Sequence, residues 1–395
     1  MRYFILSLLM VLIHMSLDAQ CDVALVSTGS ITNNASPQIS GGTIVWYGLD
    51  GTTAQIYKSE NGGAPQLVSN SASTINFNPQ ISGSTVVWQG NDGTTNQIYK
   101  SENGGAPQLV STGASTNNQL PKISGSIVVW QGNDGTTTQI YKSENGGAPQ
   151  LVSTGPSTSN RMPQISGSTI VWNGDDGVTF QIYKSENGGA PQLVSTGTST
   201  TNFGHQVSGS TIVWFGNDGT TNQVYKSENG GASQLVSTGG LTSNQAPQIS
   251  GNTIVWRGND GTTNQIYKSE SGGAPQLVST GTSINNSNPQ ISGSTIVWGG
   301  SDGTTEQIYK SENGGTPQLV STSTSTDNET PQISGSTIVW KGNDGTTTQI
   351  YKSTCPVATV VAVDPIPTMS QWGLVIFGLV ILNLSVFYVQ RRELV

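Results

Sequence analysis

Charge is scarce in this sequence. Asp, Glu, Lys and Arg make up 10% of the 395 residues, and the formal net charge is −8. A chain with so few basic groups lacks the electrostatic footprint of a nucleic-acid-binding protein. It also lacks the charge density typical of disordered chains. With 50 glycines and 17 prolines, the composition instead indicates a globular protein rich in turns.

Helical periodicity is missing as well, and a tandem repeat of 42 residues takes its place. Eight copies follow one another without insertion or deletion, and each contains the segment PQISGSTIVW with small changes. The second segment, QIYKSENGGAPQLVS, is complete in the first seven copies, whereas the last reads QIYKSTCPVA. The tryptophan that marks each copy stands at Trp46, Trp88, Trp130, Trp172, Trp214, Trp256, Trp298 and Trp340.

Four short apolar runs in each copy predict four strands, which we call A (PQIS), B (TIVW), C (QIYKS) and D (PQLVS). The turn-forming segments SGS, NDG and NGG separate them. Strand B is apolar on both faces, as expected for a strand packed between sheets. Units of this length with four strands each predict an all-β fold, an eight-bladed β-propeller. A β-solenoid is the alternative.

The last repeat has no strand D, whereas an unassigned segment, ALVSTGS at residues 24–30, precedes the first strand A and aligns with D. We therefore predict that the N-terminal strand completes the last blade and closes the ring, which removes both exposed edges. In this register Cys21 takes the position of Gly63 and Cys355 that of Asn61, two positions apart in a C-to-D turn. The spacing predicts a Cys21–Cys355 disulfide in an oxidising compartment.

The repeats resemble those of TolB-type (PD40/WD40-like) β-propellers, through PQISGSTIVW and QIYKSENGGAPQLVS. The usual SPDG of that family's A-to-B turn is SGS here. The resemblance implies the propeller fold and says little about activity, because one fold hosts many functions.

Both ends of the chain differ from the repeats. Residues 1–20 contain one early arginine and the apolar run YFILSLLMVLIHM, which predicts a signal peptide. LDAQC is a poor match to a lipoprotein cleavage site, and lipid attachment at Cys21 is the alternative to simple cleavage. The propeller should then occupy residues 21–355, followed by a linker at 356–365.

Residues 366–395 are similar to the IPTL-CTERM sorting signal of bacterial surface proteins. The matching residues are Ile366, Pro367, Thr368, Ser370, Trp372 and Gly373, and the basic pair is Arg391 and Arg392. The apolar run 372–389 is just long enough for a transmembrane helix. The resemblance implies processing by a membrane-embedded, exosortase-type protease and delivery to the cell surface or release. A plain C-terminal membrane anchor is the alternative.

Histidine provides little material for catalysis. His205 is the one histidine of the repeats, and the seven other copies have proline at its position. A single histidine without further partners makes neither a triad nor a metal site. We predict no catalytic residue, no metal and no cofactor, and we interpret His205 as a solvated loop residue.

The aspartates of the DG dipeptides indicate braced turns, with a calcium site as the alternative. The Lys and Glu of strand C, two residues apart, indicate a solvated outer face.

Four positions vary strongly between copies, whereas the position of Asn34, directly before two of them, is asparagine in all eight copies. They are the residue after Trp, the two residues eleven and ten positions before it, and the residue before QIY. In a four-stranded meander all four lie in or beside the D-to-A and B-to-C connections, which emerge at one end of every blade. From this set we predict ligand-binding residues: Tyr47, Phe77, Gln89, Gln119, Gln131, Arg161, Met162, Asn173, Phe180, Phe203, Phe215, Arg257 and Lys341.

Aromatic and basic residues of this kind are enriched at recognition surfaces. The sequence therefore favours a non-enzymatic recognition or adhesion module at the cell surface, with a glycan or a protein as ligand. Relaxed constraint on exposed loops would also produce variation. A purely structural surface or matrix protein is the main alternative function, and a carbohydrate-active enzyme is a remote one, since only Asp175 with Asp176, Glu306 and Glu329 add carboxylates to the repeat pattern.

Overall fold

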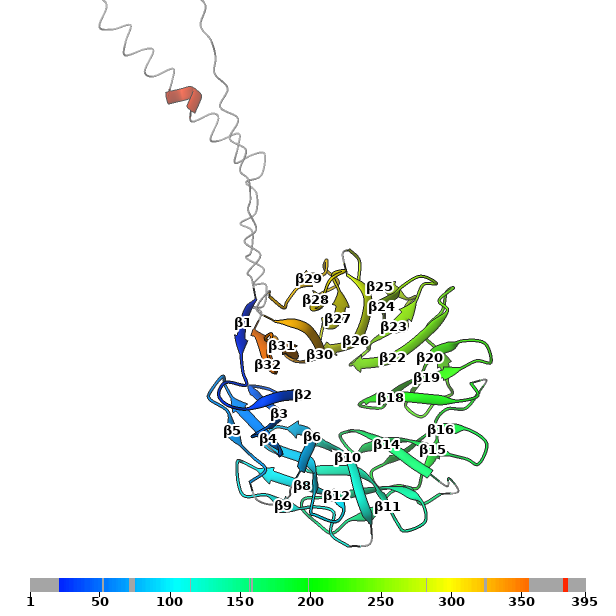
Figure 1. Cartoon of the computed structure of the whole chain (residues 1–395). Helices are drawn as coiled ribbons and strands as arrows, with labels where there is room; N and C mark the ends of the chain where they lie inside the picture. The colour runs from blue at the N-terminus through cyan, green and yellow to red at the C-terminus, as the bar shows by residue number, and fades with distance from the viewer. Residues whose placement is uncertain are drawn as a thin grey trace, which may run out of the picture. The chain divides into compact units, whose positions relative to one another are not determined.

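The computed structural model describes residues 21–51, 53–70, 75–113, 115–155, 157, 159–197, 199–281, 283–322, 325–354 and 379–382. Its repeats form a ring of eight antiparallel four-stranded sheets, the blades of a β-propeller (Figure 1). The predicted fold class is confirmed. The chain divides into two units, 1–355 and 356–395.

Blades 1 to 7 each contain four consecutive strands. The strands of blades 1 to 4 are β2 (Thr32–Ser40), β3 (Thr43–Leu49), β4 (Ala54–Glu60) and β5 (Gln66–Leu67); β6 (Ile75–Ser82), β7 (Thr85–Asn91), β8 (Asn96–Glu102) and β9 (Gln108–Leu109); β10 (Thr116–Ser124), β11 (Ile127–Asn133), β12 (Thr138–Glu144) and β13 (Gln150–Leu151); β14 (Ser159–Ser166), β15 (Thr169–Asp175), β16 (Phe180–Glu186) and β17 (Gln192–Leu193).

The remaining blades continue the same order. Their strands are β18 (Asn202–Ser208), β19 (Thr211–Asn217), β20 (Asn222–Glu228) and β21 (Gln234–Leu235); β22 (Ser243–Ser250), β23 (Thr253–Asn259), β24 (Asn264–Glu270) and β25 (Gln276–Leu277); β26 (Ile284–Ser292), β27 (Thr295–Ser301), β28 (Glu306–Glu312) and β29 (Gln318–Leu319); and, in blade 8, β30 (Thr326–Ser334), β31 (Thr337–Asn343), β32 (Thr348–Thr354) and the N-terminal β1 (Asp22–Leu25).

Blade 8 confirms the predicted closure. Its strand order is β1-β32-β31-β30, with Asp22 opposite Thr354 and Leu25 opposite Tyr351. Ser27 Oγ donates to Gln349 Oε1 at 2.6 Å, as the equivalent serine does inside the other blades. The closing strand is thus bonded as the outer strand of every other blade is, and the ring has no unpaired end.

The core lies between blades, because strand B is apolar on both faces as predicted. Between blades 3 and 4, Val129 and Ile140 pack on Trp172 and Tyr183. Trp172 is 1% exposed, and its ring stacks on Tyr183 with centroids 6.2 Å apart. The same contact recurs at each blade interface, which explains why tryptophan marks every repeat.

A buried asparagine joins each blade to the one before it. Asn160 is fully buried, and its Oδ1 accepts a hydrogen bond from Trp172 Nε1 at 2.8 Å. Its Nδ2 donates to Gln139 Oε1 of blade 3 at 2.9 Å. The unvarying Asn34 of the first repeat has the same role, across the closure, with Gln349. These amides satisfy the indole N–H that burial would otherwise leave unpaired.

The lysines of strand C are not fully solvated, which corrects the prediction of a solvated outer face. The lysine side chains of the seven Lys–Glu pairs are 5–14% exposed, whereas the glutamates are 25–60% exposed. Six of these seven lysines lie against the glycine turn of the next blade: a Cβ on Gly104, for example, would meet Lys58 Nζ at 3.2 Å. The sequence pattern identified the charge pair but not the neighbour that covers the lysine.

Most of the predicted segments outside the repeats lie beyond the described residues. The segments not described are the predicted signal peptide, the linker, the sorting motif and all of the predicted transmembrane segment except residues 379–382. Within the part that the structure describes, no helix has both the length and the apolar character needed to cross a membrane.

Candidate functional site

The variable positions meet at one mouth of the central channel. Strand A is the innermost strand of each blade, and neighbouring A strands contact one another around the ring (Figure 1). The variable residue of strand A lies directly opposite the variable residue after Trp on strand B. The eight pairs are Ala35–Tyr47, Phe77–Gln89, Gln119–Gln131, Arg161–Asn173, Phe203–Phe215, Gln245–Arg257, Ser287–Gly299 and Glu329–Lys341.

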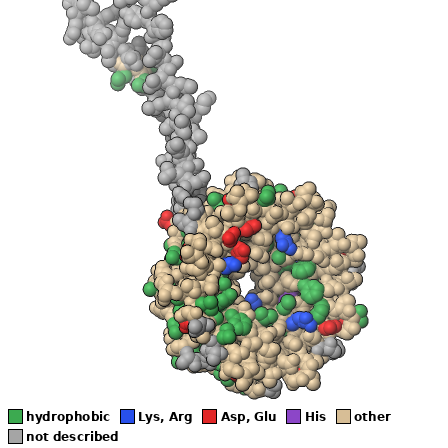
Figure 2. All heavy atoms as spheres, in the orientation of Figure 1, with side chains coloured by type: hydrophobic (Ala, Val, Ile, Leu, Met, Phe, Trp, Pro, Cys, Tyr) green, Lys and Arg blue, Asp and Glu red, His purple; other side chains and the backbone are tan. Residues whose placement is uncertain are grey.

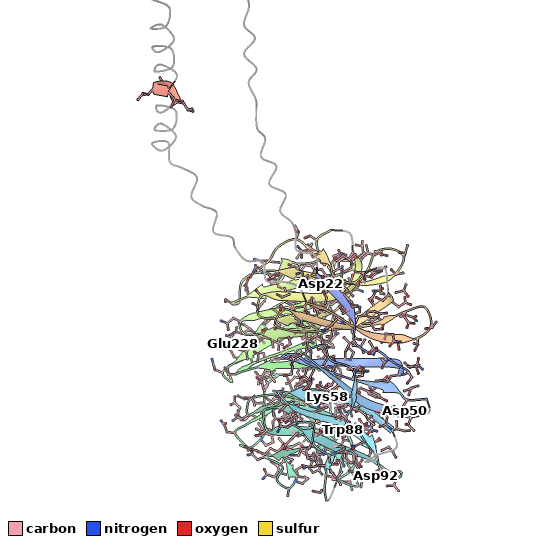
Figure 3. The ribbon with its side chains drawn as sticks, turned by 90° about the vertical axis from the view of Figure 1, so that its left-hand side faces the viewer. Asp22, Asp50, Lys58, Trp88, Asp92 and Glu228 are labelled. Atoms are coloured by element: carbon pink, nitrogen blue, oxygen red, sulfur yellow. The ribbon has the colours of Figure 1, made fainter. Side chains whose placement is uncertain are left out.

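Figure 3 shows the ring from the side, with Asp50 and Asp92 of two B-to-C turns projecting on one side and Glu228, before a C-to-D turn, on the other. We call the side of the B-to-C turns the variable face. Figure 2 views this face around the central opening: acidic side chains gather at one part of the rim, and hydrophobic and basic side chains occupy others. The rim is therefore chemically divided although the blades are nearly identical in backbone.

The second variable position of strand A is a β-bulge with left-handed backbone. Its φ is between +49° and +59° in all eight blades, at Ser36, Asn78, Leu120, Met162, Gly204, Ala246, Asn288 and Thr330. Leu, Met and Thr are unfavourable there by about 1 kcal/mol each, and glycine would remove that cost. Only blade 5 has glycine. Strain of this kind is concentrated at functional sites, which supports a role for the rim.

Two of the predicted ligand-binding glutamines, Gln89 and Gln131, already form hydrogen bonds within the propeller. Gln89 is 3% exposed, and its Oε1 accepts from Asn78 Nδ2 at 3.2 Å and from the bulge N–H of Leu120 at 3.4 Å. Gln131 Oε1 accepts from the bulge N–H of Met162 at 3.0 Å. Both side chains therefore hold the next blade's bulge, a contact between repeats that the sequence could not reveal.

Blades 4 and 5 together form an aromatic sector. The Phe180 and Phe203 ring centroids are 5.4 Å apart, and those of Phe203 and Phe215 are 6.2 Å apart. The Arg161 guanidinium lies over the Phe180 ring, with Cζ 4.5 Å from its centroid. All four side chains are partly exposed, and Met162, which follows Arg161 in the chain, is 46% exposed. The structure thus brings four of the predicted residues together as one patch.

Blades 7 and 8 form an acidic sector. Glu329 pairs with Lys341 at 2.8 Å across strands A and B. Partial burial raises the pKa of Glu306, and the negative charges of Glu329, Asp327 and Asp302 raise it further. Asp327 was not among the predicted site residues, although its repeat position varies in sequence. Arg257 of blade 6 donates to Gln245 and makes no ion pair among the described residues.

The DG aspartates brace their turns, as predicted. Asp92 Oδ1 accepts from the N–H groups of Thr94 and Thr95 at 2.9 and 2.8 Å. The hydrogen bond from the Thr95 backbone, joined by those from Thr94, holds the pKa of the Asp92 carboxyl well below its usual range. These carboxylates are committed within their own loops, and no group of three or more metal-binding side chains occurs among the described residues.

His205 is not the solvated loop residue that the sequence suggested. It lies on β18 and is 2% exposed, and neither ring nitrogen makes a hydrogen bond of normal geometry, although backbone groups of Met162 and Val171 lie close to the ring. Burial lowers its pKa to about 4, opposed by nearby backbone groups of Met162 and Val171, and the charge of Lys122 lowers it further. Burial also lowers the pKa of Lys122 to about 8. The loop assignment was wrong because strand A begins earlier than PQIS, at the variable segment.

His205 should make the stability of the ring depend on pH. Its folded-state pKa of about 4 lies below the ordinary 6.5, so its contribution is present above pH 6.5 and is lost as the pH falls through 4. We expect a loss of about 3 kcal/mol over this range. Chemical denaturation from pH 7 to 4 measures it, with His205→Pro, the residue of the other repeats, as the control. If the free energy of unfolding depended on pH equally in the two proteins, this role of His205 would be excluded.

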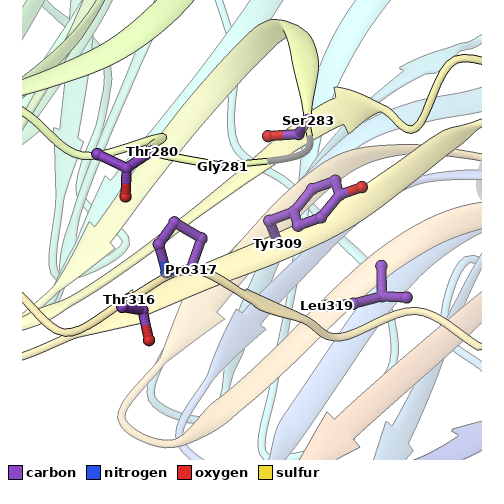
Figure 4. Close-up of a pocket in the computed structure, with 7 residues that line it drawn as sticks. All are labelled: Thr280, Gly281, Ser283, Tyr309, Thr316, Pro317 and Leu319. Atoms are coloured by element: carbon purple, nitrogen blue, oxygen red, sulfur yellow. The ribbon is translucent and has the colours of Figure 1, made fainter.

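A groove between blades offers a second concave surface. It has a volume of about 410 Å³ and is lined by Thr280, Gly281, Ser283, Tyr309, Thr316, Pro317 and Leu319 (Figure 4). Similar grooves with the same leucine position occur at other interfaces. Most positions that line these grooves carry the same residue in nearly every repeat, although Thr316 stands where six repeats have alanine. We therefore assign the grooves to the propeller scaffold, whereas the strongly variable chemistry lies at the channel mouth.

Comparison with known proteins defines the class as a β-propeller without naming a family. No family model matches the sequence, and no curated protein matches it. Among solved structures, a prolyl endopeptidase superposes with a TM-score of 0.57 at 12% identity, over 80% of this chain and 55% of its own. This chain thus corresponds to about half the length of that enzyme.

Two further structures extend this likeness to peptidases. The propeller domain of the Trilobed protease from Pyrococcus furiosus gives 0.54 at 10% identity, over 75% of this chain and 97% of that domain. A puromycin-hydrolysing peptidase from Mycobacterium tuberculosis gives 0.52 at 11%, over 82% and 61%. Identities this low establish the fold alone. Two TolB structures also match, but at TM-scores of 0.40 and 0.39 they carry no argument.

These neighbours overturn the prediction of a non-enzymatic recognition or adhesion module. The propellers that superpose on this chain belong to peptidases, so excluding an enzymatic context was wrong. The sequence misled because a variable channel mouth looks the same whether it serves adhesion or substrate entry to a hydrolytic domain outside the repeats. The structural and carbohydrate-active alternatives gain no support from these comparisons.

Proposed function

We propose that this chain is the substrate-binding propeller of a peptidase system, which receives extended polypeptide at the channel mouth and works with a hydrolase. The observation that carries the proposal is the rim of eight strand A–strand B pairs, chemically divided and bordered by a strained bulge in every blade. The peptidase neighbours support polypeptide as the ligand class.

The hydrolytic groups would come from outside the described residues. His205 is the one described histidine, and neither of its ring nitrogens is bonded to a hydroxyl or thiol. The described part of the chain therefore holds no nucleophile–histidine pair of the kind that a serine or cysteine peptidase uses. A separate catalytic domain or partner chain fits this arrangement.

Binding of unfolded polypeptide tests the proposal. Full-length protein should retain extended decapeptides of mixed sequence immobilised on a surface. Changing Tyr47 and Phe77 to Ser, and Arg257 and Lys341 to Gln, should weaken retention about tenfold or more, because aromatic and basic anchors dominate such contacts. A control carries Lys142→Gln on the opposite face. Retention of no peptide, or equal retention by both variants, would count against the proposal.

We include export of the protein and its sorting by an exosortase-type protease in the proposal. Export would place the propeller in an oxidising compartment. Cys21 is not a free thiol. Asp22 lies opposite Thr354 in an antiparallel pair, and the same register continued by one residue would pair Cys21 with Cys355, which lies outside the described residues. We expect a disulfide that ties the closing strand to the last blade.

Peptide mapping of the exported protein without reducing agent should find Cys21 and Cys355 in one cross-linked fragment, and intact-mass measurement should find residues 1–20 removed. Reduction should lower the free energy of unfolding by about 4 kcal/mol on the chain-entropy argument for a long loop. Two free thiols in the exported protein would exclude the pairing.

A further inference from the structure

The interface between blades 4 and 5 departs from the other blades in its buried polar groups. Three buried side-chain atoms make no hydrogen bond of normal geometry among the described residues: Asn173 Oδ1 and both ring nitrogens of His205. Such atoms are rare in folded proteins, because each costs about 1–3 kcal/mol. Both residues belong to the interface of blades 4 and 5, so the cost in folding free energy falls at one place on the rim.

The other repeats show how this cost is normally avoided. At the position of Asn173, Gln89 and Gln131 reach the bulge N–H of the next blade. Asn173 is one methylene shorter, and its Nδ2 donates instead to Asn202 O at 2.6 Å, which leaves Oδ1 unpaired. At the position of His205, seven blades carry proline, which has no side-chain polar atom.

An aromatic ring occupies the space that a side chain at the bulge of blade 5 would need. Gly204 is the one glycine at the bulge position, and a Cβ there would meet Phe215 Cε1 at 2.6 Å. The glycine and the phenylalanine therefore depend on each other. Independent drift at two exposed positions does not explain such a fit, whereas an assembled aromatic wall does.

Arg161 stands at the edge of this wall with its charge unneutralised. Nη2 donates to Ser159 Oγ at 2.9 Å, and no carboxylate pairs with it among the described residues. Lys341 on the acidic sector, by contrast, is neutralised by Glu329. A guanidinium with free donors binds a carboxylate through its planar fork.

We propose that the interface of blades 4 and 5 is a subsite for the C-terminal residue of a peptide ending in a bulky apolar side chain. The terminal carboxylate binds Arg161, and the side chain packs on Phe203 and its aromatic neighbours. Arg161 and Phe203 each lie within about one residue's span of Phe180, and a C-terminal residue presents both groups from a single Cα. The inference rests on the proposed polypeptide-binding function and names its specificity.

Three synthetic hexapeptides test the subsite on the full-length protein: acetyl-Gly-Ala-Gly-Ala-Gly-Phe as the free acid, the same peptide as the C-terminal amide, and the free acid ending in Ala. Titration calorimetry should show the first binding at least about tenfold more tightly than the other two, the value of one charge-assisted contact or one buried ring.

Arg161→Gln should abolish the difference between acid and amide, and Phe203→Ala that between Phe and Ala, while Lys142→Gln on the opposite face changes neither. Equal binding of acid and amide, or a difference that survives Arg161→Gln, would overturn the subsite and leave the proposed function standing. If neither these hexapeptides nor the mixed decapeptides bind, the proposed function fails and the subsite with it.

Discussion

Deleting residues 21–27 is expected to lower the free energy of unfolding by about 5 kcal/mol and to make the ring prone to association. The deletion removes β1 and exposes the strand β32 as an unpaired edge. It also removes the buried Val26, worth about 2 kcal/mol, and the Ser27 hydroxyl, which donates to Gln349 Oε1 and accepts from the Ile350 N–H.

Thermal unfolding and size-exclusion chromatography measure these effects. Adding a synthetic peptide of residues 21–30 to the deleted protein should restore part of the stability, because the peptide can pair with β32 in the native register. Cys21→Ser separates the disulfide from the strand, since it keeps β1. An unchanged melting temperature after the deletion would show that β1 does not close the ring in solution.

Replacing Asn286 by alanine should cost about 3–4 kcal/mol, the second largest effect expected. Asn286 is fully buried, and its Oδ1 accepts from Trp298 Nε1 at 2.8 Å. Its Nδ2 donates to Gln265 Oε1 of the preceding blade at 3.0 Å. Alanine leaves the indole N–H without its partner, weakens the bonding of the glutamine oxygen and opens a cavity between blades 6 and 7.

Asn252→Ala is the matched control, because Asn252 is exposed in an A-to-B turn and its backbone oxygen, which accepts from Ser271 N, is unaffected by the change. It should change stability by less than about 0.5 kcal/mol. Denaturant unfolding of both variants decides the question. If Asn286→Ala were as mild as the control, the bridging amide would not be a main connection between blades.

Much of the frame could be predicted from the repeat. The spacing of Trp46 and its equivalents defined eight units, the apolar strand B predicted packing on both sides, and the missing last strand predicted closure by the N-terminus. These inferences succeed because strand period, turn chemistry and edge pairing are local or depend only on counting. The rim was located for the same reason, since a meander sends alternate connections to opposite ends.

Contacts between repeats could not be read from the chain. Nothing in the sequence shows that Gln131 holds the Met162 bulge, that His205 is buried, or that Gly204 makes room for Phe215. At each position a departure from the repeat consensus marked the residue as unusual, but it did not show which residue of the neighbouring blade it contacts. The function class was misjudged because one fold hosts many functions, and the repeat pattern does not distinguish among them.

By itself, the sequence determined the blade count, the strand order and the face that varies, because each follows from periodicity and from pairing rules that act along the chain. Only the tertiary structure decided which variable side chains are occupied by the frame and which gather as the Arg161, Phe180, Phe203 and Phe215 patch. The reason is physical: these contacts join strands of neighbouring blades, whose side chains meet only when the ring is closed.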